Sequence, residues 1–553
     1  MKGARAVVEC LAEQGVDTVF GYPGGMILPL YDAIYDDKRI KHILTTHEQS
    51  AAHAADGYAR ASGKVGVCLA TSGPGATNLV TGIATAFMDS IPMVAITGQV
   101  DMTLLGRDAF QETDIVGVTM PITKHNYKVK DAKKLIPILR EAFRIAKSGR
   151  PGPVLVDIPR NLFFAEAGSM TPLPPKKEPA KPDTDFLICA AEAVEVMRKA
   201  KKPLVIAGGG IISANASREF TAFVEKYRLP VANTLMGIGA FPASHPQAIG
   251  FAGMHGRKAA NNAIAAADLI IAVGSRFADR QTGALDKYTT DTRFIHIDID
   301  PAEIDKNISS AIGLAGDMKT ILKLLMKHEP QSDLTRWWEK IRSWEDEYAY
   351  DYNVERLTLP WALHHIAGVS AGKNLAFATD VGQHQMWSAL HLRIEEPRTW
   401  FTSGGLGTMG FGLPAAMGAQ LAFGNKRRLV HIAGDGGIKM TGSEYYTIAR
   451  LKLPVISIIV NNTSLGMIRQ LQKVMYNERY MACEFDYQMD FAAYAESFGI
   501  PAETVSTPDD FAAAFDKALS ADGPRVIVMN IWRSFVEPMT KGGASINEFV
   551  DFK

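Results

Sequence analysis

Length, composition and charge exclude several classes of protein. The chain has 553 residues, more than the roughly 100 to 200 of a usual domain, so we expect about three domains. Its 59 basic residues balance 59 acidic ones, which leaves no net charge to attract nucleic acid or anionic lipid. We therefore expect small-molecule chemistry, with neither a nucleic acid nor a membrane as partner.

The N-terminal sequence and the cysteines predict a cytoplasmic protein. The first 25 residues indicate an amphipathic helix, a strand and a turn, and they lack the uninterrupted apolar stretch of a signal peptide. No apolar run approaches the roughly 20 residues that span a bilayer. The widely spaced cysteines are typical of free thiols in a reducing compartment, namely Cys10, Cys68, Cys189 and Cys483.

Short β-branched runs alternate with helical patterns along the chain and predict an α/β fold. Such runs occupy residues 64–71, 203–210, 269–275 and 428–437. The alternation predicts parallel sheets with right-handed crossovers, here in three doubly wound domains. Ligands in these folds bind at the carboxyl ends of strands, where the Gly-rich turns of this chain lie.

Two composition shifts divide the chain. Prolines and charges at residues 165–185 indicate a linker, and a Trp- and charge-rich stretch at 336–356 indicates a second boundary. The predicted domains cover residues 1–165, 186–335 and 357–540, and a C-terminal tail covers 541–553.

Two neighbouring strand ends carry oxygen ligands for a metal. Asp435 follows one predicted strand and Asn462 ends the next, and their carboxylate and amide oxygens suit Mg²⁺ bound to a diphosphate. A helix from about Thr441 would direct its N-terminal amides at the phosphates. The backbone can approach a phosphate closely at Gly434, Gly436 and Gly437. A lone GDG is also a common βα turn, but its spacing to the Asn pair resembles the signature of thiamine-diphosphate enzymes.

Glu48 follows another predicted strand and precedes a helix of small residues. An isolated glutamate there more often caps a helix or lies on the surface. The flanking sequence HEQSAAHAADGYAR, however, resembles the thiamine-enzyme pattern. The resemblance implies a carboxylate that shares a proton with N1′ of the aminopyrimidine and so activates the cofactor, in an apolar site that strengthens this interaction.

Further segments resemble the catalytic subunit of acetohydroxyacid synthase, also called acetolactate synthase, over nearly the whole chain. They are RDAFQETDIVGVTMPITKHN, SGRPGPVLVDIPRN, GMHG, VGSRFADR, TDVGQHQMW, SGGLGTMGFGLPAA and VEPMTKGGASINEF. The resemblance implies pyrimidine-binding, central FAD-binding-like and diphosphate-binding domains. It also implies decarboxylation of pyruvate and carboligation to a second 2-keto acid, pyruvate or 2-ketobutyrate, in branched-chain amino-acid biosynthesis.

The resemblance further implies that active sites lie between two subunits of a homodimer or homotetramer. Glu48 would then face the Asp435 domain of a partner chain. A small regulatory subunit is a further expected partner.

The same resemblance assigns cofactor contacts. The diphosphate-binding surface would include Val381, Gly382, Gln383, His384, Gly407 and Met467, with Ser464 as a further Mg²⁺ ligand. Met409 would wedge thiamine diphosphate into its bent form, although a methionine alone is more often part of a core. FAD, in a structural and not a redox role, would contact Arg150, Gly208, Gly209, Thr234, Leu235, Met254, His255, Gly256, Arg276, Asp298 and Asp317. Ala278 stands where Asp is common beside the flavin, which argues against tight FAD binding.

Substrate contacts are implied in the same way. The residues near the reacting carbon would be Gly25, Phe110 and Gln111. The guanidinium of Arg280 would hold the acceptor's carboxylate, its alternatives being a surface or a flavin-contacting position. Leu471 stands where the family commonly has a Trp that helps to select 2-ketobutyrate, so we predict a weaker preference for that acceptor.

Three other functions stay open. A pyruvate oxidase would use both organic cofactors but would need the flavin beside the thiazolium, and the synthase-like DAFQET and QHQMW segments argue against it. Another thiamine lyase or carboligase would differ in its acceptor pocket. A catalytically silent binding partner would not need Glu48, Asp435 and Asn462 together.

Overall fold

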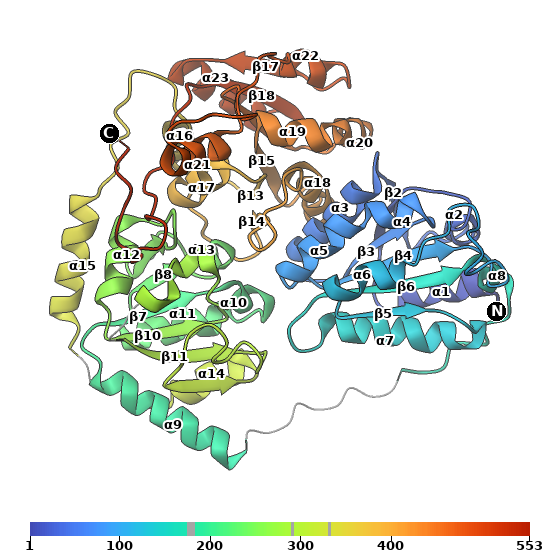
Figure 1. Cartoon of the computed structure of the whole chain (residues 1–553), viewed down its shortest axis with the longest axis horizontal. Coiled ribbons are helices and arrows are strands. Elements are labelled where there is room, and N and C mark those ends of the chain that lie inside the picture. Colours follow the sequence, from blue (N-terminus) through green and yellow to red (C-terminus); the bar gives the residue numbers. More distant parts are fainter. Residues whose placement is uncertain (174–182, 289–291, 330–332, 553) are drawn as a thin grey trace.

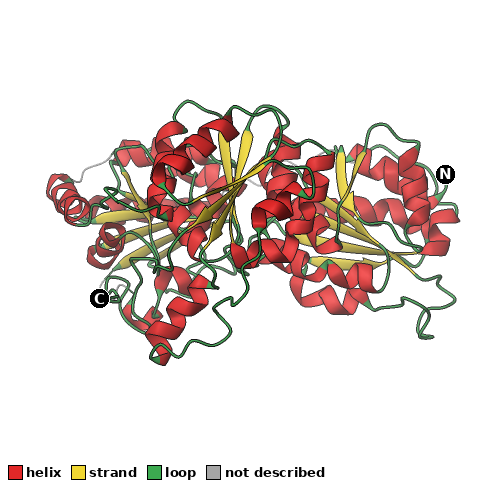
Figure 2. Cartoon of the chain, turned by 90° about the horizontal axis from the view of Figure 1, so that it is seen from above, coloured by secondary structure: helices red, strands yellow, loops and turns green. Residues whose placement is uncertain are grey.

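The computed structural model describes residues 1–173, 183–288, 292–329 and 333–552 (Figure 1). It contains three six-stranded sheets, and each consists of parallel strand pairs. Helices lie on both faces of the sheets, and the chain termini lie at opposite ends of the molecule (Figure 2). The predicted α/β fold with three doubly wound sheets is confirmed. Part of the predicted linker, residues 174–182, lies outside the described residues.

The N-terminal sheet has the strand order β2-β1-β3-β4-β6-β5. Its strands are β1 (Thr18–Gly21), β2 (Lys41–Leu44), β3 (Gly66–Ala70), β4 (Met93–Gln99), β5 (His125–Lys128) and β6 (Pro153–Pro159). Its helices are α1 (Gly3–Glu13), α2 (Leu28–Tyr35), α3 (Glu48–Ser62), α4 (Pro74–Asn78), α5 (Val80–Met88), α6 (Ile115–Thr119), α7 (Leu135–Lys147) and α8 (Arg160–Phe164), with short η1 (Met120–Ile122) and η2 (Ala132–Lys134). The predicted helix, strand and turn at the N-terminus are thus confirmed.

The central sheet has the order β12-β11-β10-β7-β8-β9. Its strands are β7 (Pro203–Ala207), β8 (Val231–Asn233), β9 (Ala248–Phe251), β10 (Leu269–Val273), β11 (Arg293–Asp298) and β12 (Ile312–Ala315). Around it lie α9 (Thr184–Lys199), α10 (Gly209–Ser213), α11 (Ser217–Tyr227), α12 (Lys258–Ala266), α13 (Asp279–Thr282), α14 (Met318–Leu325) and α15 (Thr335–Glu347), with η3 (Leu235–Gly237) and η4 (Leu285–Lys287).

The C-terminal sheet has the order β14-β13-β15-β16-β18-β17. Its strands are β13 (Leu375–Thr379), β14 (Trp400–Phe401), β15 (Arg428–Gly434), β16 (Ile456–Asn461), β17 (Ala502–Val505) and β18 (Arg525–Asn530). Its helices are α16 (Leu359–Val369), α17 (Gln383–His391), α18 (Gly412–Phe423), α19 (Asp435–Thr441), α20 (Tyr445–Arg450), α21 (Gly466–Tyr476), α22 (Phe491–Glu496) and α23 (Pro508–Leu519), with η5 (Gly442–Glu444). Each sheet lies inside one predicted domain, whereas the domain limits themselves stay a prediction.

One predicted helix start was wrong. The helix expected from about Thr441 begins at Asp435, directly at the end of β15, and Thr441 is its last residue. Gly436 and Gly437 suggested a loop because glycine is a poor helix former. A Cβ at Gly437 would lie 2.2 Å from Asp380 Oδ2, so close packing requires glycine inside this helix.

The N-terminal and C-terminal domains share one hydrophobic core, which includes Phe20, Ile83, Leu413 and Met417. Helices α3 and α18 cross at two glycines. A Cβ at Gly57 would lie 2.1 Å from Ala415 O, and one at Gly418 would lie 1.9 Å from Ala54 O. Without side chains at these positions the two helices approach closely and fix the two domains relative to each other.

The C-terminal tail packs on the central domain. Thr540 N donates to Met254 O at 2.7 Å, and Asn261 Nδ2 donates to Ile546 O at 3.2 Å. Ile546 is 1% exposed and belongs to a core cluster of central-domain residues. In Figure 1 the tail descends beside α12 and α13.

Two further expectations can be compared with the structure. The four cysteines are free, as predicted. Within the described ranges, no helix combines the length and the apolar character that crossing a membrane needs.

Candidate active site

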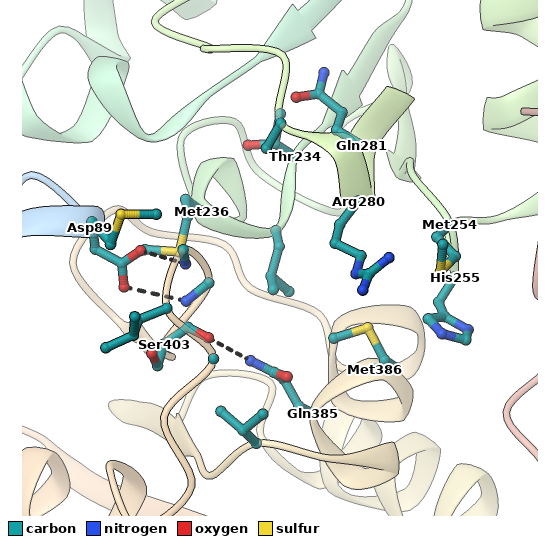
Figure 3. Close-up of a pocket in the computed structure, with 18 of the residues that line it drawn as sticks. Asp89, Thr234, Met236, Met254, His255, Arg280, Gln281, Gln385, Met386 and Ser403 are labelled. Carbon is teal, nitrogen blue, oxygen red and sulfur yellow. Dashed lines mark hydrogen bonds between the residues drawn. The ribbon is translucent and has the colours of Figure 1, made fainter. Parts of the chain in front are cut away.

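A cavity of about 1210 Å³ lies where the three domains meet. Strand order reverses between β13 and β15 in the C-terminal sheet and between β7 and β10 in the central sheet, so the connections after these strands run in opposite directions and leave a crevice. The cavity spans both crevices. Figure 3 shows side chains from all three domains around it, among them Asp89, Arg280 and Gln385.

Three predicted metal ligands come together at one end of the cavity. Ser464 N donates to Asp435 Oδ2 at 3.2 Å and to Asn462 Oδ1 at 3.1 Å, and Ser464 Oγ donates to the same Asn462 oxygen. Asp435 is 2% exposed, and burial raises the pKa of its carboxyl to about 6. A cation at these oxygens would offset the cost of burying the charge.

The diphosphate surface predicted at residues 381–384 begins α17, next to the metal ligands. His384 is buried at 5% exposure, and its Nε2 has no hydrogen-bond partner within the described part of the chain. Burial lowers the pKa of His384 to about 4, so the ring is neutral at physiological pH. A buried ring nitrogen without a partner in a cavity fits a ligand oxygen or a bound water.

Asp380, which the sequence analysis missed, organises this end of the cavity. Its Oδ1 accepts from Val381 N and from Gly410 N, both at 2.8 Å. Burial raises the pKa of Asp380 to about 7. Its position directly before the VGQH segment was the signal that could have identified it.

At the other end of the cavity, the adjacent ends of β7 and β10 form a narrow cradle. A Cβ at Gly208 would lie 2.0 Å from Gly274 O, so the two strand ends touch. Arg150 reaches this end from the N-terminal domain and donates to Glu303 Oε1 and to Ser90 Oγ, both at 2.7 Å. Most of the predicted flavin contacts line the cavity, namely Arg150, Gly209, Thr234, Leu235, Met254, His255, Arg276, Asp298 and Asp317.

Two predicted flavin contacts have packing roles and do not line the cavity in the described structure. Gly208 touches Gly274, and a Cβ at Gly256 would lie 2.4 Å from Gly253 N. Both glycines allow this close packing, and neighbouring residues form the surface that lines the cavity.

The predicted acceptor residues lie on the cavity wall. Arg280 has a 73% exposed side chain and forms an ion pair with Asp279 at 3.6 Å, so much of its guanidinium is free to bind a carboxylate. Leu471 faces the cavity from α21. Met409 and Met467 line it as well, together with Gly407, Gly434, Gly436 and Gly437.

The predicted catalytic residues of the N-terminal domain form a separate group. Glu48 begins α3, and its Oε2 accepts from Asn78 Nδ2 at 3.0 Å. A Cβ at Gly73 would lie 2.8 Å from Gln111 O, and one at Gly75 would lie 3.1 Å from Glu48 Oε1, so these residues are neighbours. In the described structure, the cavity around Asp435 is not lined by Gly25, Glu48, Phe110 or Gln111.

Other residues of the cavity were not predicted individually. Asp89, Met236, Gln385 and Ser403 line it from three domains. Gln385 and Ser403 belong to segments that resemble the family, whereas the approach of Asp89 depends on how the domains pack, which no local motif encodes.

Models of three thiamine pyrophosphate enzyme domains match this chain. The N-terminal TPP binding domain matches residues 1–118, the central domain 190–325 and the C-terminal TPP binding domain 380–529. Their matches cover each of the three sheets in whole or in large part.

Several relatives match over nearly their whole lengths. The acetolactate synthase large subunit of Parasynechococcus marenigrum (strain WH8102) is 45% identical, over 100% of this chain and 91% of the relative. The acetolactate synthase isozyme 2 large subunit of Escherichia coli (strain K12) is 43% identical over 100% of both chains. The probable acetolactate synthase large subunit of Methanocaldococcus jannaschii is 42% identical over 100% of this chain and 95% of the relative. This chain therefore belongs to the thiamine pyrophosphate enzymes and, among them, to the acetolactate synthase large-subunit family.

Proposed function

We propose that this chain decarboxylates pyruvate and joins the two-carbon unit to a second 2-keto acid, which forms acetolactate for branched-chain amino-acid synthesis. The observation that carries the proposal is the convergence of Asp435, Asn462 and Ser464 in the cavity of a TPP binding domain. When bound, thiamine diphosphate supplies the electron sink that decarboxylation of a 2-keto acid requires.

Mg²⁺ is the proposed metal at this cluster. Asp435 and Asn462 offer the hard oxygen donors that Mg²⁺ prefers while it retains phosphate oxygens. His384 Nε2, buried without a protein partner among the described residues, lies within the same cavity and is available to a ligand or a bound water. Gly436 and Gly437 let the first turn of α19 direct backbone N–H groups there.

FAD is the proposed second organic cofactor, in a structural role. The support is the close contact between Gly208 and Gly274, which forms the cradle. Arg150 and Arg276 on the cavity wall offer cations that could bind a diphosphate. Ala278, which lines the same wall, offers no carboxylate, and we expect moderate affinity.

Arg280 and Leu471 are the proposed acceptor contacts. The guanidinium of Arg280 matches a carboxylate in shape and charge. The apolar Leu471 faces the same cavity and offers the acceptor's alkyl group less contact area than a Trp would.

The proposed active site includes a second copy of the chain. Glu48 activates the aminopyrimidine, yet it lies outside the cavity around Asp435 in the described structure. The side chain of Phe110 beside Gln111 is 82% exposed, which suits a surface that a partner covers. The assembly would be a homodimer or homotetramer. Because the relatives are named large subunits, we also propose a separate small regulatory subunit as a partner.

The test is to incubate purified protein with pyruvate, thiamine diphosphate and Mg²⁺, with and without FAD, and to quantify acetolactate. Glu48→Gln should lower the rate about 100-fold or more because it removes an acid–base group. Glu141→Gln, which changes a surface ion pair of the same domain, is the matched control and should keep the wild-type rate.

Other products would assign other functions. Acetaldehyde would point to a sister decarboxylase, and acetyl phosphate with reduction of the flavin would point to a pyruvate oxidase. Absence of pyruvate turnover by protein that binds thiamine diphosphate would overturn the proposal.

A further inference from the structure

We propose that Asp89 is a positioning residue: it fixes the 403–410 segment, and with it Met409, against the thiamine site of the same chain. The inference rests on the proposed function because that function gives Met409 its task. Asp89 follows the last residue of α5 in the N-terminal domain, whereas the 403–410 segment belongs to the C-terminal domain.

The Asp89 carboxylate binds the segment through its backbone. Oδ1 accepts from Gly405 N at 2.7 Å, and Oδ2 accepts from Gly404 N at 3.2 Å. The Asp89 side chain is 1% exposed. Figure 3 shows both bonds at the edge of the cavity. Charge-assisted hydrogen bonds in a buried place are stronger than neutral ones, so this contact can hold a segment that has no helix or strand of its own.

Arg60 from α3 completes the anchor. Its Nη2 donates to Asp89 Oδ2 at 2.9 Å, and its Nη1 donates to Thr402 O at 2.9 Å, just before the segment. Asp56 also pairs with Arg60, so the guanidinium keeps a buried counter-charge when Asp89 is replaced. A variant at Asp89 therefore does not leave Arg60 as an isolated buried charge.

A second contact holds the far half of the segment. Thr85 Oγ1 and Thr408 Oγ1 lie 2.7 Å apart and are buried, so one donates to the other. Thr85 and Asp89 lie one turn apart at the C-terminal end of α5. One helix end of the N-terminal domain thus holds both halves of the segment.

The segment needs such outside support because of its own backbone. Gly407 has φ 72° and Gly410 has φ 87°, in the left-handed region that glycine favours at an entropic cost. Met409 lies between them, and its Cε would be 3.4 Å from a Cβ at Gly436, so it sits over the turn that begins α19. A shift of the segment would move Met409 relative to the diphosphate site.

Three domains converge at the anchor. A Cβ at Gly404 would lie 2.4 Å from Met236 Sδ of the central domain, and one at Gly405 would lie 2.8 Å from Arg276 Nη2. Positions 404 and 405 therefore have room only for glycine, and Asp89 binds their backbone N–H groups. The N-terminal domain would accordingly serve two sites: Glu48 acts in a partner's site, and Asp89 shapes the site of its own chain.

The experiment measures hydrogen exchange of the 403–410 amides and the affinity for thiamine diphosphate with Mg²⁺, in the full-length chain. Asp89→Ala should raise exchange at Gly404 and Gly405 about 10-fold or more and weaken the cofactor by about 10-fold, since it removes bonds to a charged acceptor. kcat should fall while KM for pyruvate changes less than about twofold. Asp89→Asn should lie between, because its amide oxygen still accepts one N–H.

Asp37→Asn is the matched control: it removes another buried carboxylate paired with arginines in the same domain, and it should change none of these quantities at the 403–410 segment. Wild-type exchange or unchanged cofactor affinity in Asp89→Ala would overturn the inference.

If Asp89→Ala does not fold, Thr85→Val tests the inference instead. It should weaken the affinity for the cofactor about threefold or more, because it removes one buried hydrogen bond. Unchanged affinity in Thr85→Val would overturn the inference. Hydrogen exchange needs no turnover, so a wild-type chain that makes no acetolactate would refute the proposed function while the anchor is still tested.

Discussion

The carboxyl edges of the N-terminal and C-terminal sheets share one construction and lie in different surroundings. At each point where strand order reverses, a glycine lets two segments touch: a Cβ at Gly24 would lie 2.4 Å from Thr71 Cγ2, and one at Gly437 would lie 2.2 Å from Asp380 Oδ2. The C-terminal edge faces the cavity and carries buried Asp435. The N-terminal edge presents Gly25 and Phe110 to solvent.

Under the proposed function, the two edges would be halves of one site with unequal independence. The C-terminal edge would hold the diphosphate and metal within one chain. The N-terminal edge has its carboxylate at Glu48 but needs a cover to exclude water, which strengthens electrostatic interactions there.

The largest expected effect comes from mixing two inactive variants. Glu48→Gln damages the N-terminal edge and Asp435→Ala the C-terminal edge, and each alone should lose about 100-fold or more of activity. If each site uses both edges from different chains, random mixed dimers contain one intact site, and the mixture should recover about a quarter of wild-type acetolactate formation. Activity that stays at the level of the separate variants after subunit exchange would place both edges of a site in one chain.

Glycine-to-alanine substitutions should have smaller effects, and these should differ between the two edges. Gly437→Ala forces a methyl group onto Asp380 and should cost about 1 to 3 kcal/mol, with a matching loss of thiamine diphosphate affinity. Gly25→Ala meets nothing within 4 Å and should change stability by less than about 0.5 kcal/mol. Thermal melting and cofactor titration give both quantities, and equal destabilisation by the two variants would contradict the contrast.

The cavity side should also set the choice of acceptor. Leu471→Trp adds aromatic contact area and should raise the preference for 2-ketobutyrate over pyruvate by roughly 10-fold. A competition assay with both acceptors measures the product ratio. A wild-type chain that already forms mainly the 2-ketobutyrate product would show that Leu471 does not weaken this preference.

The smallest expected effect is the pH dependence of stability that Asp157 of the N-terminal domain causes. Asp157 accepts from Thr97 Oγ1 and Gln99 Nε2, and burial raises the pKa of its carboxyl to about 6. Because the folded pKa is raised, the stabilisation by this group is complete below the unfolded pKa of about 4 and is lost as pH rises through about 6. About two pKa units correspond to a total loss of about 3 kcal/mol, of which about half falls between pH 5 and pH 8.

The Tm of Asp157→Asn relative to wild type should therefore rise by roughly 3 to 6 °C between pH 5 and pH 8. Asp114→Asn is the control, since its pairing with Lys128 lowers the pKa and leaves no titration in this range. An offset for Asp157→Asn that is the same at both pH values would show that this carboxyl does not titrate there.

The sequence was sufficient for the α/β pattern because β-branched runs and helical periods are local signals. It also identified Asp435 and Asn462, since the ends of neighbouring parallel strands must meet at one edge. Strand order within each sheet was beyond its reach, because order depends on which strands pair over long distances. The start of α19 was misjudged because glycine propensity suggested a loop, whereas packing against Asp380 requires glycine in that helix.

The candidate site was predicted where motifs are contiguous and missed where domains meet. Residues 381–384 were found from one segment, while Asp380 immediately before them was overlooked although it binds both Val381 and Gly410. Asp89 reaches Gly405 across 316 residues of chain, which no spacing rule reveals. That Gly25 and Glu48 lie outside the cavity likewise becomes visible only in three dimensions.

The packing of the C-terminal tail has a consequence for synthesis on the ribosome. Ile546 fills the core of the central domain, although that domain's last strand, β12, ends at Ala315. During translation the N-terminal domain can fold as soon as it emerges. The core of the central domain is completed only by Ile546, which is synthesised after the last strand of the C-terminal sheet, β18.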